Sequence, residues 1–103
     1  MAYDIDEVRE EIEAGTAQLL DVREQNEWDM GHLSDAKLVP LSQLQHGIEP
    51  TDFDQSKKTY LHCRSGQRVY AAAPILKAMG FEDVTPLDEG FEELVANGVF
   101  EEA

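Results

Sequence analysis

Residues 59–69 read TYLHCRSGQRV, and this stretch predicts a strand, a tight polar turn and the start of a helix in immediate succession. Residues 59–62 are typical of a buried strand, and residues 67–79 read as a helix that Gly80 ends. In an open α/β sheet, the turn between such a strand and helix lies at the carboxyl edge, where ligands bind. The stretch therefore predicts an α/β fold, with Cys63 at the strand end beside a binding edge.

On both sides of this stretch, short strand-like runs alternate with helix-like runs, which is typical of an α/β domain with a mainly parallel sheet. Strands are expected at residues 3–5, 17–22, 37–40, 59–62 and 84–87, the first of them a short edge strand. Helices are expected from Asp4 or Asp6 to Gly15 and over residues 24–30, 67–79 and 91–96, with helix and loop over residues 42–54. Pro74 lies inside the helix over residues 67–79 and should remove one backbone hydrogen bond there.

The length and composition suit one compact domain. The chain has 103 residues, and we expect a single domain over residues 1–103. A lone cysteine cannot form an internal disulfide, and the first residues lack the basic and apolar regions of a signal peptide, so we expect a reducing cytoplasm. No apolar run approaches the ~20 residues that a membrane helix needs. A net charge of −14 disfavours nucleic acids and anionic membranes as partners.

The scarce positive charge of this acidic chain is concentrated around its cysteine. Two of the four arginines, Arg64 and Arg68, lie within five residues of Cys63. Backbone amides at a helix N-terminus favour anions, and guanidinium groups add full charges. Such surroundings stabilise a reactive thiolate and suit an anionic substrate. The alternative interpretation is a small buried hydrophobic residue beside surface arginines. The strand–cysteine–turn–helix context favours the reactive thiol.

The chain resembles the rhodanese-like sulfurtransferases over almost its whole length. The sequence CRSGQR at residues 63–68 is similar to the active-site loop of that family. Residues 19–41, with Asp-x-Arg after a strand, resemble its upstream segment, and residues 75–91 resemble its downstream segment. The resemblance implies a rhodanese-like three-layer fold, with a five-stranded, mainly parallel sheet and helices on both faces. The departures from the family pattern lie outside the cysteine loop, at Asp35, Glu89 and Leu94, while Gly90 keeps one permissive turn position.

The resemblance also implies a reaction in which Cys63 carries sulfane sulfur as a persulfide. The sulfur would come from thiosulfate or a persulfide donor and pass to cyanide or a thiol, with a protein as a possible donor or acceptor and with no metal or organic cofactor. The residues expected to bind substrate are Arg64, Ser65, Gly66, Gln67 and Arg68. Arg68 is expected to orient the sulfonate of thiosulfate, because a guanidinium fork suits oxyanions. Asp21 and Arg23 follow another strand and are expected to support the loop as part of an ion-pair network. His62 precedes Cys63 on a strand, so its side chain should point away from the thiol.

Two other functions remain open on the sequence alone. A cysteine phosphatase uses a related loop, but that loop needs five residues between cysteine and arginine, whereas four separate Cys63 from Arg68. A shorter loop makes a smaller cradle, which suits a persulfide sulfur better than a phosphate. A sulfur-carrier or binding module, acting with a protein donor and with little thiosulfate turnover, would have the same loop chemistry.

Overall fold

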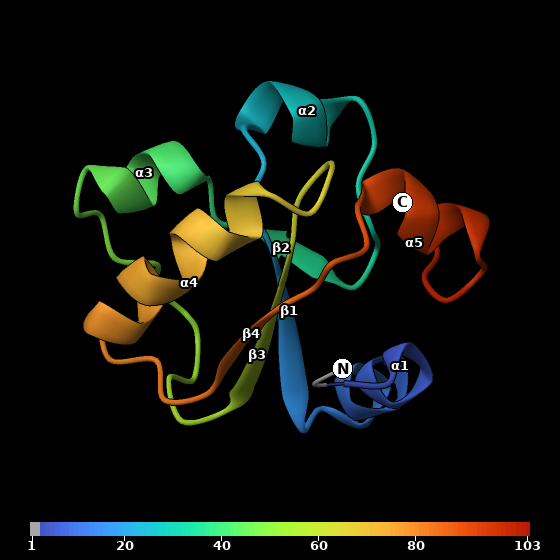
Figure 1. Cartoon of the computed structure of the whole chain (residues 1–103), viewed down its shortest axis with the longest axis horizontal. Coiled ribbons are helices and arrows are strands. Elements are labelled where there is room, and N and C mark those ends of the chain that lie inside the picture. Colours follow the sequence, from blue (N-terminus) through green and yellow to red (C-terminus); the bar gives the residue numbers. More distant parts are fainter. Residues whose placement is uncertain (1–2) are drawn as a thin grey trace.

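The two central strands of one sheet carry runs of residues that are buried on both faces, which is typical of parallel sheets. The computed structural model describes residues 3–103. In it β1 (Ala17–Asp21), β2 (Ala36–Leu38), β3 (Lys58–His62) and β4 (Val84–Pro86) pair in the order β2-β1-β3-β4, and every pair is parallel. The carboxyl ends of β1 and β3 lead toward the top of Figure 1, where α2 and the loop before α4 lie.

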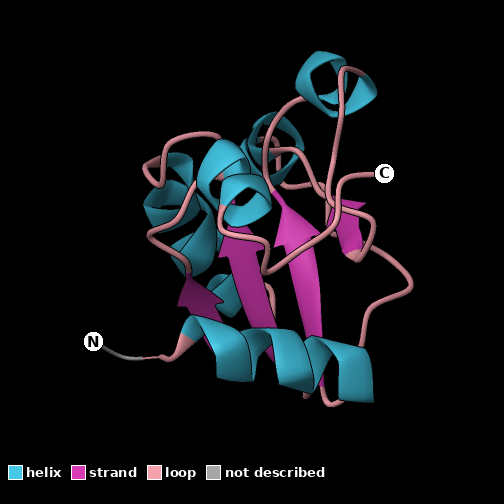
Figure 2. Ribbon diagram, turned by 90° about the vertical axis from the view of Figure 1, so that its right-hand side faces the viewer, coloured by secondary structure: helices cyan, strands magenta, loops and turns pink. Residues whose placement is uncertain are grey.

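The helices cover both faces of this sheet (Figures 1 and 2). They are α1 (Ile5–Ala14), α2 (Gln25–Asp29), α3 (Leu41–Gln45), α4 (Arg68–Ala78) and α5 (Phe91–Ala96). Leu20 and Leu61 pack with α3 and α4 in one buried cluster, whereas Leu19 and Tyr60 pack with α1 and α5 in another. Because neighbouring strand residues point to opposite faces, the central strands β1 and β3 each contribute to both clusters.

The sheet differs from the predicted one in the number of its strands. Residues 3–103 form four strands, so the expectation of five is wrong within the described part of the chain. The predicted edge strand at residues 3–5 is absent, because Ile5 already begins α1. Asp4 caps that helix, with its side chain accepting a hydrogen bond of 3.0 Å from the Asp6 amide. The capping bond directs the chain into the helix instead of along the sheet.

The junction at residues 59–69 is confirmed in its main features. β3 ends at His62, Cys63 follows at once, and α4 begins at Arg68. The helix continues through Pro74 to Ala78. The loop at residues 63–67 therefore lies at the carboxyl edge of the sheet, next to the carboxyl end of β1.

Candidate active site

Cys63 lies fully buried at the end of β3, with the following loop wrapped around its sulfur. The amide of Gly66 donates a hydrogen bond to Cys63 Sγ over 3.2 Å. Gly66 has a φ of +78°, a left-handed conformation that glycine adopts without steric cost. The turn therefore directs an amide at the thiol, which is an arrangement that stabilises negative charge on sulfur.

A second segment, residues 88–90, holds this loop from outside. A methyl group built on Gly66 would lie 2.3 Å from the Asp88 carbonyl oxygen. One built on Gly90 would lie 2.0 Å from the Arg64 carbonyl oxygen. The carbonyl of Cys63 also accepts a hydrogen bond of 2.9 Å from the Phe91 amide. The two loops thus meet backbone to backbone, and the glycines at positions 66 and 90 leave the space for this contact.

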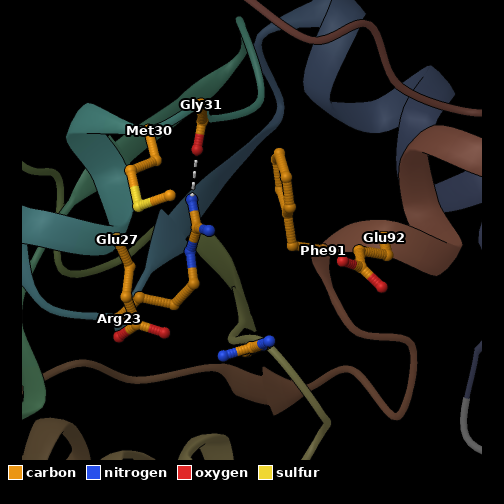
Figure 3. A pocket seen from close by; sticks show the side chains of 7 residues that line it. Arg23, Glu27, Met30, Gly31, Phe91 and Glu92 are labelled. Carbon is orange, nitrogen blue, oxygen red and sulfur yellow. Dashed lines mark hydrogen bonds between the residues drawn. The ribbon is translucent and has the colours of Figure 1, made fainter.

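Asp21 and Arg23 form a buried ion pair beside the loop. Arg23 Nη2 lies 2.8 Å from Asp21 Oδ2, and the same nitrogen donates a hydrogen bond of 2.8 Å to the Gly31 carbonyl (Figure 3). The Arg23 guanidinium lies 4.2 Å from the centre of the Phe91 ring. Both side chains are therefore committed to internal contacts that link β1, α5 and the chain after α2, and their support of the loop stays a prediction.

Arg68 is also bound by a carboxylate, and the partner is distant in the sequence. Its two terminal nitrogens donate hydrogen bonds of 2.6 and 2.8 Å to the carboxylate oxygens of Glu27, 41 residues away. The hydrogen bonds from Arg68 lower the pKa of Glu27 to about 2, and the Glu27 carboxylate raises the pKa of Arg68. Arg64, by contrast, is exposed and forms no ion pair with any residue in the range 3–103.

A cavity of about 240 Å³ opens next to the cysteine loop. Figure 3 shows the Phe91 ring on one side of it and Glu27 and Met30 on the other. The residues that line it are Arg23, Glu27, Met30, Gly31, Arg64, Phe91 and Glu92. Of the predicted loop residues only Arg64 contributes to this lining, whereas Ser65 and Gln67 are exposed on the turn and Cys63 lies beneath it. A small organic molecule could therefore rest beside the loop with Arg64 as its cationic contact.

Glu27 and the cavity-lining residues Met30 and Glu92 were not identified from the sequence as site residues. Glu27 belongs to the first turn of α2, where its side chain also accepts a hydrogen bond of 3.1 Å from the Glu24 amide. An acidic residue on a short helix at the carboxyl edge was a usable signal. The pairing of Glu27 with Arg68 could not be predicted, because the sequence does not show how α2 is oriented.

His62 is fully buried on the side of the sheet that faces Phe91, while Cys63 packs in the cluster with α3 and α4. Its ring nitrogens have no hydrogen-bond partner among the described residues, and the 3.7 Å from Nε2 to Asp21 Oδ2 is too long for one. Burial lowers the pKa of His62 to about 4. The ring is therefore neutral at pH 7 and serves packing.

This burial predicts a loss of stability in weak acid. The folded-state pKa of His62 is about 4, below the ordinary histidine pKa of 6.5, so the unfolded chain binds the proton more readily. The stability due to neutral His62 is complete above pH 6.5 and is lost as the pH falls toward 4. Between pH 6.5 and 5 we expect a loss of about 2 kcal/mol in the free energy of unfolding, measured with urea. His62→Gln should lack this loss, whereas His46→Gln, an exposed control, should keep it. Equal slopes for wild type and His62→Gln would contradict the prediction.

Comparison with known proteins supports the family that the fold and loop indicate. Residues 4–97 match the model of the rhodanese-like domain. The chain is 34% identical over 79 residues to the thiosulfate sulfurtransferase GlpE of Shewanella oneidensis, covering 77% of this chain and 76% of GlpE. It is 38% identical over 86 residues to the uncharacterized protein YqhL of Bacillus subtilis, covering 82% of this chain and 67% of YqhL. It spans 22% of the probable adenylyltransferase/sulfurtransferase MoeZ of Mycobacterium tuberculosis, at 33% identity.

Solved structures share the fold. The human single-domain sulfurtransferase TSTD1 superimposes with a TM-score of 0.76 at 20% identity, covering 87% of this chain and 90% of TSTD1. A rhodanese-related protein from Thermoplasma volcanium superimposes with a TM-score of 0.77 at 23% identity, covering 98% and 95%. The chain belongs to the rhodanese-like family, and the predicted resemblance is confirmed. Within residues 3–103, no helix has the length and apolar character needed to span a membrane.

Proposed function

We propose that this protein is a sulfurtransferase that carries sulfane sulfur as a persulfide on Cys63. The observation that carries the proposal is the Gly66 amide, which donates to Cys63 Sγ over 3.2 Å from a turn closed at the strand end. A persulfide places its outer sulfur about 2 Å beyond Sγ, the length of one S–S bond. The added sulfur can then project from the buried thiol into the polar turn.

The reaction has two balanced steps. The Cys63 thiolate attacks the outer sulfur of thiosulfate, the S–S bond of thiosulfate breaks, and sulfite leaves with the bonding electron pair. Cyanide or a thiolate then attacks the outer sulfur of the Cys63 persulfide, and the S–S bond of the persulfide breaks. Thiocyanate or a new persulfide forms, and the Cys63 thiolate leaves with the bonding electron pair. Because the sulfur rests on the protein between the steps, ping-pong kinetics are expected.

The loop residues have different roles in this proposal. The turn through Ser65, Gly66 and Gln67 offers backbone amides to the persulfide and to the departing anion. Arg64 lies at the cavity and is the cation available to an anionic donor. Arg68 contributes through its ion pair with Glu27, which ties the start of α4 to α2. Asp21 and Arg23 support the loop from the carboxyl end of β1.

Intact-protein mass spectrometry after thiosulfate treatment tests the proposal directly. The expected result is a gain equal to one sulfur atom, which disappears when cyanide is added while thiocyanate forms. An unchanged mass with thiosulfate and with organic sulfane-sulfur donors would contradict the proposal. So would hydrolysis of an aryl phosphate faster than any sulfur transfer, because that would indicate the phosphatase alternative.

A further inference from the structure

The charge around the cysteine loop is more nearly balanced than the arginines alone suggest. Asp21 neutralises Arg23, and Glu27 neutralises Arg68. Among the cations of the site, Arg64 is the one without a carboxylate partner in the described chain, and it shares the cavity lining with Glu92. A dianion such as thiosulfate therefore meets a single available guanidinium group.

The pair of Glu27 and Arg68 is held too firmly to be a chance surface contact. Both Arg68 terminal nitrogens contact the carboxylate, at 2.6 and 2.8 Å, which is the bidentate geometry of strong charge-assisted pairs. The Glu24 amide fixes the same carboxylate from the helix start, at 3.1 Å. The side chains are 31% and 20% exposed for Arg68 and Glu27, so solvent screens the pair only in part. Freeing Arg68 for a substrate would require breaking this arrangement.

Two large side chains in the cavity lining, Phe91 and Met30, are apolar. Phe91 presents its ring, which the Arg23 guanidinium fixes by stacking. Met30 is 88% exposed, although methionine side chains are usually buried. Its flexible thioether can adapt to an apolar body of variable shape. The cavity therefore offers an apolar body a contact surface that thiosulfate cannot use.

We propose that Glu27 determines the donor specificity of this site: by binding Arg68, it disfavours dianionic thiosulfate and favours sulfane-sulfur donors with one negative charge and an apolar body, such as organic thiosulfonates. The inference rests on the proposed function. Glu27 acts through Arg68, so it is a positioning residue, and its removal should release a guanidinium group for thiosulfate.

The step with a thiosulfonate balances like the step with thiosulfate. The Cys63 thiolate attacks the outer sulfur of the thiosulfonate monoanion, its S–S bond breaks, and the sulfinate leaves with the electron pair. The two donors thus undergo the same bond changes and yield the same Cys63 persulfide. They differ in one unit of charge and in the apolar body, which makes them a matched pair of probes.

The test measures kcat/KM for thiosulfate and for benzenethiosulfonate in wild type, Glu27→Gln and Asp29→Asn. In wild type we expect benzenethiosulfonate to be favoured by about tenfold or more, a factor typical of one charged hydrogen bond. Glu27→Gln should raise kcat/KM for thiosulfate by about tenfold and change that for benzenethiosulfonate by less than about threefold. Asp29→Asn removes one negative charge from the exposed end of the same helix, outside the cavity lining and without releasing an arginine, so its effect should stay below about threefold for both donors.

A double variant shows whether the gain passes through Arg68. Adding Arg68→Gln to Glu27→Gln should abolish the gain with thiosulfate. Equal gains in Glu27→Gln and Asp29→Asn would overturn the inference, because the change in net charge alone would explain them. So would parallel losses with both donors in Glu27→Gln, which would indicate mere loop support. If Glu27→Gln does not fold, the ratio of kcat/KM for the two donors in the wild-type protein tests the inference. A higher kcat/KM for thiosulfate than for benzenethiosulfonate then overturns it. Absence of a Cys63 persulfide with either donor would instead refute the proposed function.

Discussion

Replacing Cys63 with serine is expected to abolish sulfur transfer, with a fall in kcat/KM of at least about a thousandfold, because no other thiol in the chain can carry the sulfur. The fold should remain, since a serine hydroxyl is nearly the same size and can accept the hydrogen bond that the Gly66 amide now donates to sulfur. The measurements are thiocyanate formation from thiosulfate and cyanide, and the intact mass after donor treatment.

The wild-type protein serves as the control in this experiment, with its added sulfur removed again by cyanide. Circular dichroism of Cys63→Ser establishes that the fold is retained. If the folded serine variant still produced thiocyanate at a rate near that of wild type, the persulfide mechanism would be wrong.

Replacing Gly90 with alanine is expected to lower both stability and sulfur transfer. Gly90 has φ −84° and ψ 175°, which alanine adopts freely, so the cost comes from the methyl group that would lie 2.0 Å from the Arg64 carbonyl oxygen. Relieving that overlap must shift residues 64 and 65, directly after Cys63. We expect a loss of about 1–3 kcal/mol in the free energy of unfolding, the usual cost of overpacking, and a loss of activity of at least about tenfold.

Gly47→Ala provides the contrast for this prediction. Gly47 has φ +77° and no atom within 4 Å of an added methyl group, so alanine there has only the left-handed backbone cost of about 1–2 kcal/mol. Sulfur transfer should be unchanged in Gly47→Ala when both variants are assayed below their unfolding temperatures. If Gly90→Ala retained full activity, the backbone contact between the two loops would have no part in shaping the site.

The residues around Cys63 show which features local patterns could predict. The strand, the cysteine and the helix over residues 59–78 were predictable, because apolar runs, turn residues and helix ends act over a few positions. A helix cap at Asp4 or Asp6 and the end of α1 at Gly15 were predictable for the same reason, and the structure places the cap at Asp4. The edge strand at residues 3–5 was not, because an extended segment becomes a strand only if a neighbouring strand pairs with it.

Gly90 illustrates a feature that was recognised for the wrong reason. The sequence suggested a turn that needs unusual backbone angles, whereas its φ of −84° is ordinary and the need is for space beside Arg64. A close approach between two loops depends on the path of both chains, and no local pattern records it.

The amino-acid sequence by itself determined the order along the chain of β1 to β4 and the helices between them, and the position of Cys63 at a strand end, because these follow from short-range preferences. The tertiary structure alone decided which charges of the site are available to a substrate. Glu27 lies 41 residues from Arg68, and only the placement of α2 against the start of α4 brings their side chains to 2.6 Å. Coulombic attraction in a partly solvated site acts over a few ångströms, so pairing depends on where the fold places each group, whatever their separation along the chain.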